Sequence, residues 1–213
     1  MQWHRPRHDL VVLTLPFSVL RGIELDASLE LPAWKRDAFE VGYGTNSKNM
    51  VGFTSRPWAA LGSNGVGYSD LANHQASWET NPSMATGSRA VLTDYASGPR
   101  GASFNPASAQ TTTAAWLTDL DRVFPGAKAA ARKSAGKYVV AMSAWPSDPN
   151  SKGSYTAYRP GQFTTIAGNE GKPIGNLHFA GEHTNSFYVW QGFMEGACLS
   201  GIDAAKAMLR ANR

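Results

Sequence analysis

The sequence predicts a mixed fold of α-helices and β-strands, and three stretches of the chain carry that prediction. Residues 9–16 (DLVVLTLP) form a continuous apolar run closed by proline, which is typical of a strand buried on both faces of a parallel sheet. Residues 47–53 alternate between two sets of side chains, as a strand with two unlike faces does. Residues 191–209 place small side chains at helical spacing. A chain with all three patterns and no internal repeat belongs to the mixed α/β (α+β) class.

The other expected elements alternate helix and strand along the chain. The strongest is a helix over 113–124, where Leu117, Leu120 and Phe124 recur at helical spacing before Pro125-Gly126 stops it. Glycine- and serine-rich stretches predict loops at 61–69 and 146–153. The remaining expectations are a short helix over 34–41 and strands over 89–96 and 137–145.

The helix expected over 191–209 is rich in residues that weaken helices. Gly192, Gly196, Ser200 and Ala204 follow one another at intervals of four, beside a second small row of Ala197, Gly201 and Ala205. Each internal glycine costs about 0.5 to 1 kcal/mol relative to alanine, so several together need a reason. We expect a backbone or a flat ligand to approach this helix closely, with Gly192 and Gly196 at the contact. Glu195, Asp203 and Lys206 argue against a membrane dimerisation helix.

Composition excludes several classes of protein. No run approaches the ~20 apolar residues of a spanning helix, and the first nine residues lack the apolar stretch of a signal peptide. The net charge of +4 is scattered, without the basic and aromatic stripe of a nucleic-acid binder. Cys198 is the single cysteine, so no internal disulfide can form. We therefore expect a soluble, cytoplasmic chain that binds neither nucleic acid nor membrane.

A metal site is the first chemistry to weigh. His178, Glu182 and His183 lie close together in sequence, but their spacing is not the H-E-x-x-H of a metalloprotease helix. Residues five apart across a strand end do not share one face. We expect no metal here.

The segment HFAGEHTNSFYVWQGFMEGACLSGIDAA, residues 178–205, resembles the C-terminal flavin-binding segment of the flavin-containing monoamine and polyamine oxidase family. Three other blocks resemble that family in the same order: DLVVLTLPFSVL, GYGTNSKNMVGFTSRPW and SAWPSDPNSKGSYTAYRPGQ. The resemblance implies non-covalent FAD as cofactor. It also implies oxidation of an amine by hydride transfer to flavin N5, with oxygen reduced to hydrogen peroxide.

The resemblance implies three segments: 1–37 as part of an FAD-binding domain, 38–147 as a substrate-binding domain with a mixed sheet, and 148–213 as the C-terminal FAD-binding segment. The G-x-G-x-x-G turn, which binds pyrophosphate in dinucleotide folds, is not found in this sequence. The glycines at 62, 65 and 67 follow no apolar strand and predict a loop. We therefore expect an incomplete two-domain fold, inactive alone, which a separate N-terminal FAD-binding chain would complete.

Similarity to the family assigns cofactor contacts to the C-terminal segment. Gly181 and Glu182 follow a strand whose carboxyl end faces the nucleotide, and Glu182 is expected near the ribityl or phosphate region. Gly192, Phe193 and Met194 are expected to open the last helix with unpaired N–H groups directed at the flavin ring.

Three residues are expected to act in catalysis. By resemblance Lys48 holds a water near flavin N5 and favours the reduction of oxygen. Tyr155 and Phe193 match the two aromatic residues that flank the substrate amine. Taken alone, each aromatic would more often be a core residue and Lys48 a solvated edge lysine.

Further positions bear on cofactor linkage and substrate. Ser154 occupies the place of the cysteine that bonds to flavin in monoamine oxidases, so the flavin should be non-covalent. Cys198 is expected to be a small buried residue. An L-amino-acid oxidase would need an arginine for the substrate carboxylate, and Arg56 and Arg159 are available. A non-catalytic fragment or assembly subunit is the alternative from another class.

Overall fold

The structure is a computed structural model that describes residues 7–81, 87–187 and 189–211. The chain forms two compact units. Unit 2 is the continuous stretch 44–148, whereas unit 1 combines residues 1–43 with 149–213. These limits lie close to the expected segment boundaries, while the functions assigned to the segments stay predictions.

Unit 2 is built on a five-stranded sheet with the order β3-β4-β5-β2-β8. Its strands are antiparallel to their neighbours: β2 (Ser47–Phe53), β3 (Gly67–Leu71), β4 (His74–Glu79), β5 (Ala90–Ala96) and β8 (Val140–Ala144). The interior strand β2, which lies between β5 and β8, is the one whose limits the alternating pattern predicted.

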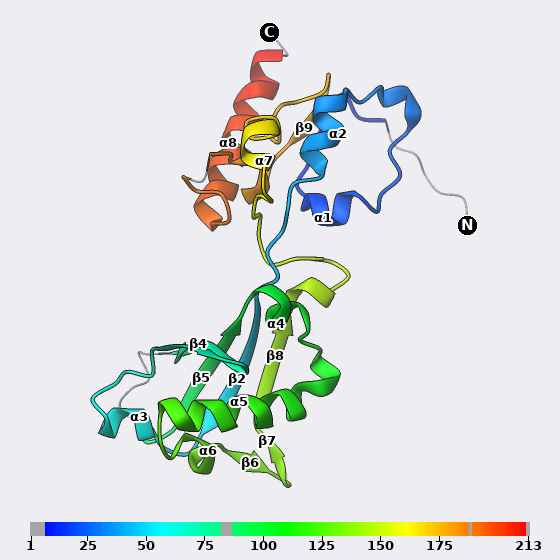
Figure 1. Ribbon diagram of the computed structural model, residues 1–213. Helices are drawn as coiled ribbons and strands as arrows, with labels where there is room; N and C mark the ends of the chain where they lie inside the picture. Colours follow the sequence, from blue (N-terminus) through cyan, green and yellow to red (C-terminus); the bar gives the residue numbers. More distant parts are fainter. Residues whose placement is uncertain (1–6, 82–86, 188, 212–213) are drawn as a thin grey trace. The chain divides into compact units, whose positions relative to one another are not determined.

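One face of this sheet is covered by helix α5 (Ala109–Val123), which lies along it in Figure 1. The side chains of Val51, Phe53 and Leu92 pack against Trp116 and Leu117 of α5 in the core of unit 2. Helix α5 ends where Pro125 and Gly126 follow, and Gly126 adopts a left-handed φ of 90°. Smaller elements complete the unit: α3 (Pro57–Ala60), α4 (Gly98–Ala102), η3 (Pro106–Ser108), α6 (Ala127–Ala130), β6 (Lys133–Ser134), β7 (Lys137–Tyr138) and η4 (Trp145–Ser147).

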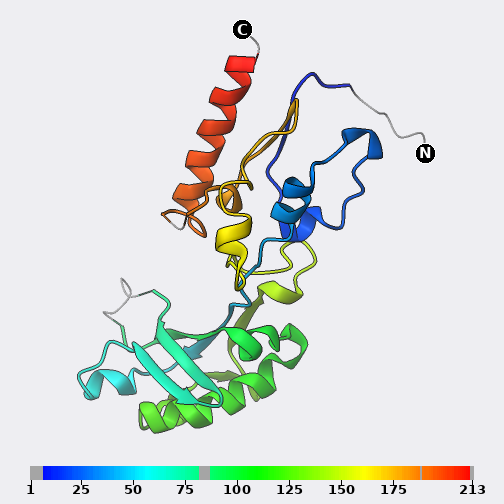
Figure 2. The same ribbon diagram turned by 45° about the horizontal axis from the view of Figure 1, so that its top comes forward.

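Unit 1 contains a two-stranded parallel sheet made from distant parts of the chain, β1 (Val11–Leu13) and β9 (Leu177–Phe179). Its core packs Phe17, Leu20, Phe39 and Phe179 together. The helical elements are α1 (Phe17–Leu20), η1 (Ala27–Leu29), α2 (Ala33–Phe39), α7 (Gln162–Thr165), η5 (Glu182–Thr184) and α8 (Met194–Ala211). Figure 2 shows this unit from a second direction, with the residues around α8 and α7 in orange and yellow.

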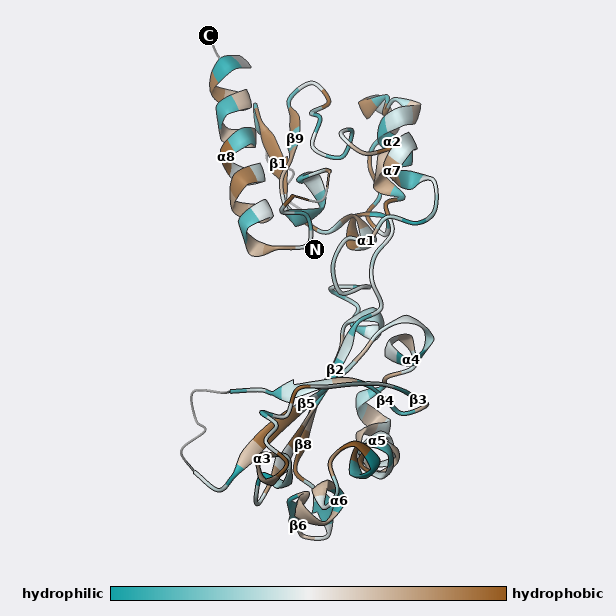
Figure 3. Cartoon of the chain, turned by 60° about the vertical axis from the view of Figure 1, so that its left-hand side comes forward, coloured by the Kyte–Doolittle hydropathy of each residue, from teal (hydrophilic) through white to brown (hydrophobic). Residues whose placement is uncertain are grey.

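Helix α8 packs on β9 and η5, and Figure 3 shows hydrophilic and hydrophobic bands alternating along it beside the two strands. A Cβ added at Gly196 would lie 2.1 Å from the backbone oxygen of Trp190, so Gly196 marks a close backbone approach. A Cβ at Gly201 would meet nothing within 4 Å. The first small row therefore faces packed structure, and Gly201 in the second does not.

Several expectations are corrected. Strand β1 is shorter than residues 9–16 and is not buried on both faces, because Val11 is 39% exposed. Cys198 is exposed, not buried. The region expected as a loop over 61–69 ends in strand β3, and the hairpin of β3 and β4 was not foreseen. The expected strand over 137–145 is divided into β7 and β8. Residues 1–6, part of the nine N-terminal residues that lack the apolar stretch of a signal peptide, lie outside the described residues.

Candidate active site

The carboxylate of Glu182 joins two chain segments of unit 1. Its Oε1 accepts hydrogen bonds from the backbone N–H (3.1 Å) and the hydroxyl (2.9 Å) of Thr156. Its Oε2 accepts the backbone N–H of Gly192 at 2.7 Å. Because charge-assisted hydrogen bonds are the stronger ones, this carboxylate fixes the segment around Thr156 beside the turn that contains Gly192.

The residues next to these two anchors are the aromatic pair that the sequence singled out. Tyr155 precedes Thr156, and Phe193 follows Gly192. Both contribute to an open hollow of about 530 Å³, lined by Tyr155, Thr156, Ala157, Tyr158, Gln191, Gly192 and Phe193. Tyr155 is 40% exposed and Phe193 61% exposed, so neither is the core residue that an aromatic side chain more often is. The structure thus brings two of the three expected catalytic residues to one hollow.

The start of the last helix differs from the expectation. Helix α8 begins at Met194, and Gly192 lies before it with a left-handed φ of 83°. The N–H of Gly192 is donated to Glu182, and the N–H of Phe193 is donated to the backbone oxygen of Trp190 at 3.1 Å. The expectation that Gly192 and Phe193 offer unpaired N–H groups is therefore wrong, because a tight turn uses both. Met194 is 88% exposed at the first position of the helix.

Gly181 is also engaged within the protein. Its N–H donates to the hydroxyl oxygen of Ser200 at 2.9 Å, and its carbonyl accepts that hydroxyl at 3.0 Å. This position needs glycine, because its φ is 132° and a Cβ added to it would lie only 2.4 Å from the ring of His183. Gly181 thus couples the end of β9 to α8 and lets the chain turn into Glu182.

Another carboxylate, the fully buried Glu170, is hydrogen-bonded to a residue that lines the hollow. It accepts hydrogen bonds from the hydroxyls of Tyr158 and Ser186. Burial, and the hydrogen bond to Glu170, raise the pKa of Tyr158 above its ordinary value. The amide of Gln191 reaches the same tyrosine oxygen at 3.2 Å. Two lining residues of the hollow, Tyr158 and Gln191, are therefore held by this network.

Lys35 holds the loop that carries Glu170. Its buried Nζ donates to the backbone oxygens of Glu170 (2.6 Å) and Lys172 (2.8 Å) and lies 3.6 Å from the ring centroid of Phe179. Burial lowers the pKa of Lys35 to about 7. Burial, with Lys35 nearby, lowers the pKa of His183 to about 4. Sequence reasoning did not find Lys35, whose sole local signal is a cation within a short helix.

Lys48, the third expected catalytic residue, belongs to unit 2. It is half-buried on β2, directly opposite Tyr95 of β5 and Ser143 of β8. Its Nζ lies 6.0 Å from the centroid of the Tyr95 ring. Asn49 and Val51 point toward α5, so the alternation of β2 places Lys48 on the opposite face of the sheet.

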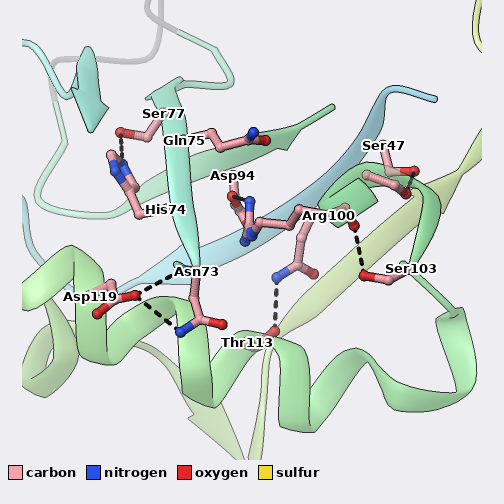
Figure 4. A network of polar contacts seen from close by, with 12 residues as sticks. Ser47, Asn73, His74, Gln75, Ser77, Asp94, Arg100, Ser103, Thr113 and Asp119 are labelled. Carbon is pink, nitrogen blue, oxygen red and sulfur yellow. Dashed lines mark hydrogen bonds and ion pairs between the residues drawn. The ribbon is translucent and has the colours of Figure 1, made fainter. Parts of the chain in front are cut away.

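Unit 2 also contains a buried polar layer that sequence reasoning missed (Figure 4). The fully buried Asp94 forms two hydrogen bonds with the guanidinium of Arg100, at 2.9 and 2.7 Å. Burial raises the pKa of Asp94 to about 6, against the opposing effect of Arg100. Asn49 donates to the hydroxyl of Thr113 at 3.0 Å. The layer joins the sheet to α4 and α5, and a buried acid on a strand is its one sequence signal.

The remaining candidates do not form a site. Arg56 is bound to Glu79 at 2.8 Å and its side chain is 11% exposed, while Arg159 is exposed in unit 1. Ser154 lies one residue before Tyr155. Within the described ranges, no group of three or more His, Cys, Asp or Glu side chains could hold a metal ion. His178 and His183 each bury a ring Nε2 that has no hydrogen-bond partner among the described residues.

Comparison with known proteins identifies the family. The sequence profile of the flavin containing amine oxidoreductases matches residues 4–209. The chain belongs to this family. It is 31% identical over 199 residues to polyamine oxidase 4 of Oryza sativa subsp. japonica, covering 92% of this chain and 38% of that protein. It is 28% identical over 199 residues to YobN of Bacillus subtilis (strain 168), which carries a provisional assignment as an L-amino-acid oxidase, with 92% and 40% covered.

Solved structures agree with this family fold. Putrescine oxidase, solved with putrescine, superposes with a TM-score of 0.75 at 20% identity, covering 94% of this chain and 42% of that one. Cyclohexylamine oxidase from Brevibacterium oxydans IH-35A gives a TM-score of 0.74 at 21% identity, with 96% and 43% covered. The chain thus has part of the flavin amine oxidase fold and spans about two fifths of the length of these relatives.

None of the helices in the described part of the chain is long and apolar enough to cross a membrane.

Proposed function

We propose that this chain supplies the substrate side of an amine oxidase site, in which an amine, oxygen and water become an aldehyde or ketone, ammonia or a smaller amine, and hydrogen peroxide. The observation that carries the proposal is the Glu182 carboxylate, which holds Thr156 and Gly192 so that Tyr155 and Phe193 border one hollow. Exposed aromatic side chains whose backbone is held in place by hydrogen bonds are suited to line a binding site.

The residues at this hollow fit a flat flavin ring in part. Phe193 and Met194 are exposed large apolar groups, and the missing side chain of Gly192 lets the ring of Tyr155 pack closely, since a Cβ there would lie 3.3 Å from Cδ2 of Tyr155. The first turn of α8, from Met194 onward, would provide the partial positive charge, since Gly192 and Phe193 use their N–H groups elsewhere. FAD, bound without a covalent link, is the cofactor we propose. A bound flavin would supply the electron acceptor for the amine and pass the electrons to oxygen.

The protein's own residues would then orient the amine and exclude water. Tyr155 and Phe193 would present ring faces to an uncharged amine, because a protonated amine cannot lose a hydride. Glu182 acts as a positioning residue for both. Lys48 would place a cation and its bound water where oxygen is reduced, since positive charge stabilises the developing anion.

Stopped-flow absorbance of the flavin-loaded protein tests this assignment, because it separates flavin reduction by amine from reoxidation by oxygen. Phe193→Ala should slow anaerobic reduction and leave reoxidation near its original rate. Lys48→Met should do the reverse. Lys137→Met, an exposed lysine of β7 in the same unit, is the matched control and should change neither. Equal slowing of both half-reactions by Lys48→Met, or of neither, would remove Lys48 from this role.

A non-catalytic fragment or assembly subunit is the second candidate, and it differs from the first in binding no flavin. Calorimetric titration of the chain with FAD tests it. Without a pyrophosphate turn we expect weak binding or none by these residues alone, and stronger binding when a candidate N-terminal FAD-binding chain is co-expressed. Tight stoichiometric binding by the chain alone would overturn that expectation. Absence of binding in both arms would favour the fragment.

A further inference from the structure

The sheet of unit 2 has a face turned away from α5, and register determines which side chains share it. Lys48 lies on this face, since Asn49, Val51 and Phe53 take the other. Strand pairing places Lys48 in one row with Ala76, Tyr95 and Ser143. It places a second row beside the first, formed by Trp78, Thr93, Met50 and Ala141.

These two rows form an apolar and aromatic surface next to Lys48. The rings of Trp78 and Tyr95 are 5.1 Å apart at their centroids, with an interplanar angle of 52°. Met50 of β2 completes the surface. Lys48, Met50, Trp78 and Tyr95 are all half-buried, so their side chains are accessible in part.

Asp70 apart, the carboxylates on the sheet of unit 2 are turned away from this surface. Asp94 and Glu79 lie on the α5 side, where they bind Arg100 and Arg56. Asp119 and Asp121 belong to α5 itself, and Asp148 lies beyond η4. Asp70 is on the outermost strand β3, with two strands between it and β2. Among the described residues of the two rows, Lys48 is therefore the one charged side chain.

The charges at the far end of the same face are positive. Gly52 and Val91 line a hollow of about 180 Å³ together with Arg89 and Arg132, and with Arg56, whose charge is paired with Glu79. Gly52 is four residues from Lys48, which is roughly 13 Å along a strand. In an α-amino acid the carboxylate is bonded to the carbon that is oxidised. If that carbon lies beside Lys48, the carboxylate is too far from these arginines to bind them. A second ammonium group on the substrate, directed at this hollow, would meet arginine side chains of like charge and, among the described residues that line it, no carboxylate that could pair with it.

We infer that the amine accepted beside Lys48 carries one nitrogen and an apolar or aromatic remainder, which packs on Trp78, Tyr95 and Met50. This rests on the proposed function, because Lys48 marks the reacting end. Diamines, polyamines and α-amino acids are disfavoured, since burial of a second charge without a partner is costly.

Two measurements on the chain and on the flavin-loaded protein test the inference. In nuclear magnetic resonance spectra of the chain, benzylamine should shift the indole signal of Trp78, assigned by Trp78→Phe, whereas putrescine and L-leucine should not. In the flavin-loaded protein, kcat/KM for benzylamine or cyclohexylamine should exceed that for putrescine and L-leucine at least tenfold. A preference for putrescine or L-leucine would overturn the inference and leave the proposed function intact. No flavin reduction by any amine would overturn both.

Substitutions make the test specific to this face. Trp78→Ala should lower kcat/KM for benzylamine about tenfold and leave that for propylamine unchanged, because propylamine is too short to use the aromatic pair. Trp34→Ala, a partly exposed tryptophan of unit 1, is the control. Ala141→Glu adds a carboxylate at an exposed position opposite Met50, and should raise the ratio of putrescine to benzylamine kcat/KM. An unchanged ratio, in a variant that retains benzylamine turnover, would count against the charge argument.

Discussion

The two units of the chain are stabilised in different ways. Unit 2 is one continuous stretch whose sheet and helix enclose a large apolar core that includes Trp58, Trp116 and Phe124. Unit 1 brings together two separated stretches, and its parallel strands have three residues each. Its core is smaller and surrounds the buried Lys35, Glu170 and His183.

The difference shows where this fold places its polar interactions. In unit 1 the sheet has two short strands, and side chains join the segments that it does not pair. Lys35 binds the 169–172 loop, and Glu182 binds Thr156 and Gly192. The hollow with Tyr155 and Phe193 depends on these ties. In unit 2 the sheet itself orders Lys48 and its neighbours. Substitutions should therefore act on the two units separately, and urea titrations followed by nuclear magnetic resonance can observe each unit residue by residue.

The largest effect is expected in unit 2 from Arg100→Ala. Removing one partner of a buried ion pair leaves Asp94 buried and unpaired, which should lower the free energy of unfolding by about 3 to 5 kcal/mol at pH 8. The loss should be smaller at pH 5, where Asp94 is more readily protonated. Arg122→Ala is the control, because Arg122 is 67% exposed and 3.8 Å from Asp119, and should cost less than ~1 kcal/mol. Equal losses in both variants would refute the importance of the buried pair.

In unit 1 the next largest effect should come from Gly196→Leu. A side chain there would overlap the backbone oxygen of Trp190. We therefore expect the free energy of unfolding to fall by about 3 kcal/mol, and by no less than ~2 kcal/mol. Gly201→Leu, on the same helix but facing open space, should be neutral or slightly stabilising because leucine favours helix. Urea midpoints of the signals from unit 1 measure both. An unchanged midpoint for Gly196→Leu would remove the close-approach argument.

The sequence predicted some of this architecture because the relevant signals are local. The limits of β2 follow from alternation, and α5 follows from the spacing of Leu117 and Leu120 and the Pro125-Gly126 stop. The hairpin of β3 and β4 was missed because its strands are polar and its turn at Ala72-Asn73 lacks an Asn-Gly signal. The roles of Gly192 and Glu182 depend on partners distant in sequence. No periodicity reveals that an N–H expected to be unpaired is instead donated to a carboxylate.

Acid should act in opposite directions through His183 of unit 1 and Asp94 of unit 2, while the buried His74 of unit 2, whose pKa is also lowered by burial, acts with the sign of His183. The pKa of His183 is lowered to about 4, so folded unit 1 binds this proton less well than the unfolded chain does. Its stabilising contribution is complete above about pH 6.5 and is lost as the pH falls toward 4, by at most about 1.4 kcal/mol per pH unit. The pKa of Asp94 is raised to about 6, so its contribution to unit 2 is complete below about pH 3.9 and is lost as the pH rises through 6.

Urea titrations at pH 4.5, 5.5 and 6.5 compare these two dependences. His183→Phe should flatten the acid loss in unit 1 and leave unit 2 unaffected. His8→Gln, an exposed histidine of the same unit, is the control. If unit 1 of the His183→Phe variant lost as much stability between pH 6.5 and 4.5 as unit 1 of the unsubstituted chain, the role assigned to His183 would be wrong.

The smallest effect is expected from Glu182→Gln, and it tests most directly whether unit 1 depends on a polar tie. Glutamine keeps one acceptor oxygen but directs an NH₂ group at a backbone N–H, so the hydrogen bond to either Thr156 or Gly192 is lost. A buried donor without a partner costs about 1 to 3 kcal/mol, and because Glu182 is half-buried we expect about 1.5 kcal/mol.

The loss should be confined to unit 1, since the partners of Glu182 all lie there. Amide exchange at Gly192 and Thr156 should accelerate more than at Gly181, whose hydrogen bonds to Ser200 stay intact. Glu24→Gln, an exposed glutamate of the same unit, is the matched control and should change neither quantity. If Glu182→Gln left exchange at Gly192 unchanged, the carboxylate would not fix the turn before α8, and the positions of Tyr155 and Phe193 would depend on packing alone.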